Sequence, residues 1–136
     1  LEVAKDNPLC LFRKSQASSI KEEVNFIRRK LKNNDSYFMK RYNGEPILNQ
    51  LIEYYGDKNF NDSNLFSMTF FAYKKEACKL MQEWFLHNAL WTIEDQISFP
   101  YLLQKSGLTY SLFDGDITHN QSMFECKWEE IEKNFI

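Results

Sequence analysis

The sequence predicts an α/β fold in which a small mixed sheet is flanked by helices. Three short apolar runs, Leu9–Arg13, Leu65–Tyr73 and Leu108–Phe113, have the length and composition of buried strands. Segments with the apolar spacing of amphipathic helices alternate with them, which favours a mostly parallel sheet. Leu65–Tyr73 is apolar on both faces, so we expect it in the centre of the sheet. A chain of 136 residues is expected to form one domain over residues 1–136.

Capping patterns and apolar spacing set the expected helices. Ser19 and Glu22 form a capping box, in which a serine and a glutamate close the first turn of a helix. Gly56 is typical of a helix end. The segment Ser36–Tyr42 fits either a strand or a helical turn. Residues 1–6 are predicted to be the end of a helix. The other expected helices cover residues 19–32, 46–56, 75–90, 93–106 and 128–134.

The composition argues against several functional classes. Lys and Arg total 17 against 19 Asp and Glu, a net charge of −2, so no basic excess is present to bind nucleic acid. No apolar stretch approaches the roughly 18 residues that span a bilayer, and no signal-peptide pattern occurs. We therefore expect a cytoplasmic protein, with the Golgi lumen as the eukaryotic alternative. Because the chain begins with Leu1, we expect it to be a portion of a larger protein.

Two polar segments are candidate sites. Asp95 and Gln96 stand side by side at the start of a predicted helix, where a carboxylate either caps the helix or faces a ligand. The segment Asp114–His119 directly follows the last predicted strand, where open α/β sheets bind ligands, and a polar turn is the alternative. His87, alone on a helix, is more typical of a structural residue. No phosphate-binding loop, dinucleotide fingerprint or metalloprotease motif occurs.

Several further segments occur in a characteristic order that ends in Asp95–Tyr101, DQISFPY. The earlier segments are Leu11–Lys14, Ile20–Glu23, Gln50–Tyr54, Asn64–Phe66 and Trp84–Phe85. This series resembles the glycosyltransferase-like domain of plant mucilage-synthesis proteins, bacterial polysaccharide loci and a chlorovirus glycosyltransferase. The resemblance covers roughly residues 9–119, and DQISFPY is its specific part. Three departures are clear: Lys14 and Ser15 replace a His-Pro pair, the arginine of the same motif is replaced near Ala17, and Glu94 replaces the arginine before Asp-Gln.

The resemblance implies a partial GT-A-like, Rossmann-like fold, of which this chain is the carboxy-terminal, acceptor-side portion. It further implies a retaining, metal-dependent glycosyltransferase that moves a sugar from a nucleotide-sugar donor to a glycan or polysaccharide acceptor. Asp114-Gly115-Asp116 matches the DxD pattern of such enzymes, but it lies after the Asp-Gln helix, whereas their DxD motif lies on an earlier strand. Because that strand is missing here, the chain alone is expected to be inactive. The alternative is a non-catalytic α/β carbohydrate-binding or protein-interaction module. A hydrolase using Glu94 and Asp95 is less favoured, because adjacent helical residues point in different directions.

The resemblance also implies roles for individual residues. Asp95 and Gln96 would border the anomeric carbon, where a carboxylate stabilises an oxocarbenium-like centre. His119 and Asp116 would hold Mn²⁺, or Mg²⁺, which neutralises the diphosphate leaving group. The expected substrate-binding residues are Lys14, Gln50, Trp84, Trp91 and Tyr101, and for the aromatic ones core packing is the alternative role.

Overall fold

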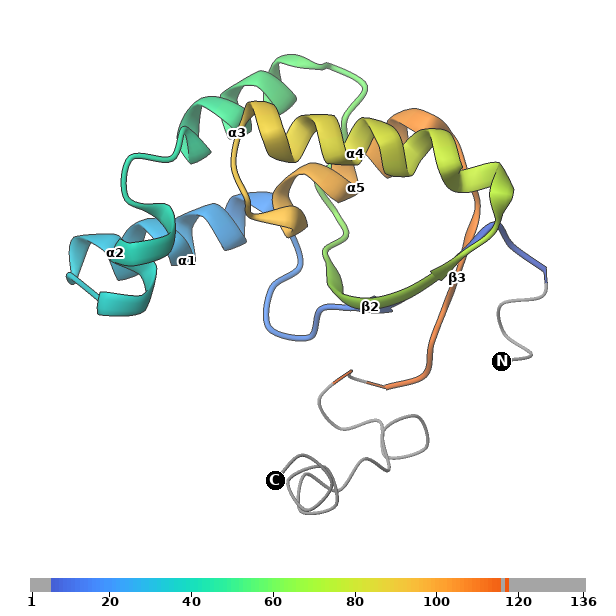
Figure 1. Ribbon diagram of the computed structural model, residues 1–136, viewed down its shortest axis with the longest axis horizontal. Helices are drawn as coiled ribbons and strands as arrows, with labels where there is room; N and C mark the ends of the chain where they lie inside the picture. The colour runs from blue at the N-terminus through green and yellow to red at the C-terminus, as the bar shows by residue number, and fades with distance from the viewer. Residues whose placement is uncertain (1–5, 116, 118–136) are drawn as a thin grey trace, which may run out of the picture.

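The computed structural model describes residues 6–115 and 117. Within them, five α-helices and one 3-10 helix accompany a three-stranded mixed sheet, which confirms the α/β prediction. The strands are β1 (Leu9–Arg13), β2 (Phe66–Tyr73) and β3 (Tyr110–Leu112), in the order β2-β1-β3. Figure 1 shows the helices gathered on one side of these strands.

The central strand is β1, so the expectation that the second apolar run is central is wrong. β1 pairs antiparallel with β2 and parallel with β3, and the expectation of a mostly parallel sheet is therefore also wrong for the β1–β2 pair. Apolar residues on both faces of β2 reflect two covered faces rather than two neighbouring strands. On the side away from the main core, Phe70 of β2 packs edge-on against Phe12 of β1, with ring centroids 6.4 Å apart.

The helices are α1 (Ile20–Lys32), α2 (Ser36–Tyr42), α3 (Ile47–Gly56), α4 (Cys78–Leu90), preceded by the 3-10 turn η2 (Lys75–Ala77), and α5 (Asp95–Ser106). The Ser19 hydroxyl accepts a hydrogen bond from the Glu22 N–H at 3.2 Å, as the capping box predicts. Asp35 caps α2 by accepting bonds from two backbone N–H groups, which explains why the undecided segment is a helix. Gly107, at φ +67°, ends α5 in the left-handed conformation.

The main core lies between the sheet and the helices. Along β1, Leu9 and Leu11 face this core, whereas Cys10 and Phe12 face the smaller cluster on the other side, as the alternation of a strand requires. Helix α5 is the most enclosed, because every residue over 97–103 is buried. It packs on α1, α4 and β2, so its first turn is held against the end of β1.

Two expectations fall mainly on residues outside the described part of the chain. These are the helix end at residues 1–6, of which only Asp6 is described and is not helical, and the helix at 128–134. Among residues 6–115 and 117, no helix is both long and apolar enough to cross a membrane.

Candidate functional site

The end of β1 meets a group of charged and polar side chains. Lys14 directly follows β1, and its Nζ lies 2.6 Å from Glu23 Oε2 on α1 and 2.6 Å from Gln96 Oε1 on α5. The residues of this Lys14 cluster are Lys14, Glu23, Arg41, Tyr42, Glu94, Asp95 and Gln96. Three residues predicted from the sequence, Lys14, Asp95 and Gln96, therefore meet in one place.

Lys14 fixes the orientation of Gln96. The side chains of Lys14 and Glu23 are only 16% and 8% exposed, so little water competes for their ion pair. Because Lys14 donates to Oε1 of Gln96, the Nε2 group of that amide remains the one that can donate to a ligand. Lys14 also lines a cleft of about 280 Å³ with residues 15–18 and 63–65, beyond the end of the strand.

Glu94 is a buried carboxyl paired with a tyrosine. It is 6% exposed, and the Tyr42 hydroxyl donates a hydrogen bond to its Oε2. Burial raises the pKa of Glu94 above its ordinary value, while the bond from Tyr42 acts in the opposite direction. The same burial, together with the bond to Glu94, raises the pKa of Tyr42. Glu94 is thus a buried member of the Lys14 cluster.

Asp95 is the first residue of α5 rather than its N-cap, which is Glu94 and makes no side-chain cap bond. Burial raises the pKa of the Asp95 carboxyl, and the charges of Arg41 and Lys14 act to lower it. The backbone carbonyl of Asp95 accepts a hydrogen bond from Trp84 Nε1 at 3.3 Å. Asp95 therefore presents a half-buried carboxylate, close to two cations, at the positive end of a helix.

The aromatic residues predicted as sugar platforms lie mostly in the core. Tyr101 is 8% exposed and stacks on Tyr54, with ring centroids 4.1 Å apart. The half-buried Trp84 ring packs edge-on against Phe99 at 5.1 Å. Trp91 is half-buried at the end of α4. One face of Tyr101 is therefore occupied by Tyr54, and Trp84 supports α5 through its indole N–H.

Gln50 belongs to a separate buried chain of hydrogen bonds. Its Nε2 donates to the Tyr54 hydroxyl at 2.8 Å, and that hydroxyl lies 2.8 Å from Nδ1 of His87. Burial raises the pKa of Tyr54 to about 12 and lowers that of His87. Gln50 is fully buried, and its Oε1 has no hydrogen-bond partner among the described residues. His87 is thus hydrogen-bonded to a core tyrosine, and its structural role stays a prediction.

The predicted metal ligands Asp116 and His119 lie outside the described residues. Of the segment that precedes them, Asp114 is exposed and Gly115 has φ +76°. Within residues 6–115 and 117, no group of three or more His, Cys, Asp or Glu side chains could hold a metal ion. The Mn²⁺ site stays a prediction.

Sequence reasoning missed Glu23, Arg41 and Tyr42 as members of the cluster. A signal exists for Glu23, because it falls on the apolar stripe of α1 between Ile20 and Ile27 and is buried there. No local pattern marks the other two. Comparisons with protein-family models, with curated proteins and with solved structures find no match to this chain.

Proposed function

We propose that the chain is the acceptor-side part of a retaining glycosyltransferase that acts on a nucleotide-sugar donor and a glycan or polysaccharide acceptor. The observation that carries the proposal is the convergence of Lys14, Asp95 and Gln96 at the carboxyl end of β1. In open α/β sheets, ligands bind at the carboxyl ends of strands. DQISFPY, the specific motif of the resemblance, begins with two of these three residues.

The chemistry of glycosyl transfer suits these side chains. A positive charge develops at the anomeric carbon in the transition state, and the Asp95 carboxylate would stabilise it. Gln96, held by Lys14, would donate its amide N–H to a sugar hydroxyl and so orient the ring. The carboxylate and imidazole of Asp116 and His119 are ligands that suit Mn²⁺, which would neutralise the charge of the diphosphate.

The first test is binding of the donor to the protein that contains this chain. Nucleotide-sugars are screened by thermal shift with and without Mn²⁺, and a donor at 100 times its Kd should stabilise the protein by about 2.7 kcal/mol. Glycan binding without transfer from any donor would instead identify the alternative, a non-catalytic carbohydrate-binding module.

The second test separates catalysis from a purely structural role of the Asp95 carboxylate, which is not the N-cap of α5. Asp95→Asn keeps the shape of the side chain but removes its charge, so we expect normal stability and a loss of at least about 10² in kcat. Gln96→Ala should lose less, since an amide only orients the sugar. The matched control is Glu53→Gln on the exposed face of α3, which should transfer sugar at the wild-type rate. Wild-type rates in Asp95→Asn would refute the catalytic assignment.

A further inference from the structure

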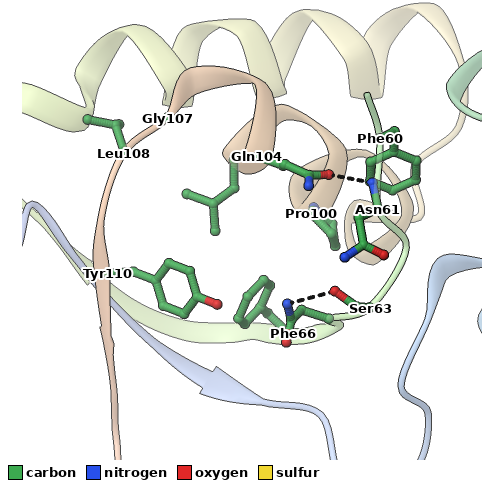
Figure 2. A pocket seen from close by; sticks show the side chains of 11 residues that line it. Phe60, Asn61, Ser63, Phe66, Pro100, Gln104, Gly107, Leu108 and Tyr110 are labelled. Carbon is green, nitrogen blue, oxygen red and sulfur yellow. Dashed lines mark hydrogen bonds between the residues drawn. The ribbon is translucent and has the colours of Figure 1, made fainter. Parts of the chain in front are cut away.

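A second cleft lies between the 57–64 loop, the C-terminal half of α5 and the segment that leads into β3 (Figure 2). Its volume is about 260 Å³. Sites for drug-sized ligands have roughly 300–1,000 Å³, so this cleft suits a ligand about the size of a single ring. Its lining includes Asn61, Gln104 and Tyr110, and none of them belongs to the Lys14 cluster.

None of the side chains that line the cleft is charged. The nearest ionisable groups in the sequence have partners elsewhere. The Asp62 carboxylate accepts bonds from two backbone N–H groups at the start of α1 and from the Tyr55 hydroxyl. Lys105 directs its Nζ to the Tyr101 hydroxyl, 3.4 Å away. A phosphate or carboxylate ligand would therefore find no charged partner in the cleft, which favours a neutral ligand.

Polar groups are nevertheless available on both sides of the cleft. Figure 2 shows the Tyr110 hydroxyl pointing into it from one side, with the Asn61 and Gln104 amides on the other. Oε1 of Gln104 accepts the Asn61 N–H at 2.9 Å. Asn61 and Gln104 are exposed and Tyr110 is half-buried, and Gln104 Nε2, the Asn61 amide and the Tyr110 hydroxyl have no partner among the described residues, so they face solvent. An apolar ligand would leave these groups unpaired, whereas hydroxyl groups would satisfy them.

The cleft also has an apolar floor and a fixed wall. Phe66, which is 2% exposed, packs edge-on against the Tyr110 ring with centroids 5.2 Å apart. In the loop, the Phe60 N–H donates to the Asp57 carbonyl at 3.0 Å, and the Ser63 N–H donates to a carbonyl two residues earlier at 2.9 Å. Because these bonds already order the loop, ligand binding does not cost the conformational entropy of ordering it.

We propose that this cleft binds one neutral pyranose ring of a glycan. The three polar groups would bind its hydroxyls, and its C–H face would lie on the half-buried rings of Phe60 and Tyr110. This site goes beyond the proposed transfer reaction, and none of the residues that line it belongs to the Lys14 cluster.

The test is an NMR titration of the 136-residue chain, following the side-chain amide signals of Asn61 and Gln104. The neutral probes are methyl α-D-glucopyranoside, methyl β-D-galactopyranoside and cellobiose, and the charged probes are glucuronate and glucose 1-phosphate. We expect at least one neutral probe to shift both signals saturably, with a Kd of roughly millimolar size. The charged probes should bind more weakly, because no cation lines the cleft.

Two variants, each of which removes one hydrogen-bonding group from the cleft, localise the binding. Tyr110→Phe and Asn61→Ala should each weaken it about three- to tenfold, the effect of one lost hydrogen bond. The matched controls, Tyr73→Phe and Asn25→Ala, change exposed residues outside the cleft and should leave the affinity unchanged. Asp95→Asn should also bind normally, which separates this site from the proposed transferase site.

Three outcomes would overturn the proposal. The first is that no neutral probe gives a saturable shift up to about 100 mM. The second is that a charged probe binds as tightly as the neutral ones. The third is that binding survives in both cleft variants while each keeps the dispersed amide spectrum of a folded chain.

Discussion

Replacing Lys14 by methionine should destabilise the fold substantially. The Lys14 ammonium lies 2.6 Å from the Glu23 carboxylate and 2.6 Å from Oε1 of the Gln96 side-chain amide. Methionine fills most of the volume of the lysine stem but donates no hydrogen bond. Glu23, whose side chain is 8% exposed, would then keep a shielded charge without a partner.

The size of the loss follows from the exposure of the pair. Removing one partner of a fully buried ion pair costs about 3–5 kcal/mol, and removing one partner of an exposed pair costs less than about 1 kcal/mol. Lys14 remains 16% exposed, so we expect an intermediate loss of about 2–3 kcal/mol. At about 4 °C per kcal/mol for a domain of this size, Tm should fall by roughly 8–12 °C.

The assay is urea unfolding followed by tryptophan fluorescence, in which the midpoint should fall while the slope stays constant. The double variant Lys14→Met, Glu23→Met removes both charges and should recover to within about 1 kcal/mol of the wild type. The matched control is Lys79→Met. Lys79 is 87% exposed and lies 3.9 Å from Glu83, so its loss should cost less than about 0.5 kcal/mol.

Two results would refute this reasoning. A loss below about 1 kcal/mol in Lys14→Met would mean that water screens the pair despite its low exposure. A double variant as unstable as the sum of the two single variants would mean that the two charges are not coupled.

Three further predictions concern stability. Burial raises the pKa of Glu94, so the folded chain holds that proton to higher pH than the unfolded chain, and the free energy of unfolding falls as pH rises above the ordinary carboxyl value. Glu94→Gln should weaken the pH dependence of the free energy of unfolding and stabilise the chain at neutral pH. Urea unfolding at pH 4, 5, 6 and 7 would contradict this if the variant showed the same pH dependence as the wild type. Gly107→Ala should lower the free energy of unfolding in urea by about 1 kcal/mol, because φ at this residue is +67°. The control Gly56→Ala, at a helix position without positive φ, should cause no loss, and equal losses in the two variants would contradict backbone strain at Gly107. Tyr54→Phe removes a hydroxyl that bonds a buried amide and should cost about 1–2 kcal/mol, against no loss in the exposed Tyr73→Phe, and equal midpoints would contradict it.

Local sequence determined most of the helices of this chain and their ends. Ser19 caps α1 and Gly107 ends α5 because capping depends on residues within one turn of the helix end. The same local chemistry decided the helix at Ser36–Tyr42, where Asp35 supplies the cap that apolar spacing alone does not reveal. Apolar content also located the three strands.

Only the tertiary structure decided the order and direction of the strands. Apolar residues on both faces of β2 indicate that both faces are covered. They do not indicate whether one or both edges of the strand pair with a neighbouring strand. The same limit applies to the candidate site. Asp95 and Gln96 are recognisable as adjacent polar residues, but Lys14 reaches Gln96 across 82 positions of sequence. That contact depends on how α1 and α5 pack at the end of β1, and long-range packing of this kind leaves no local pattern in the chain.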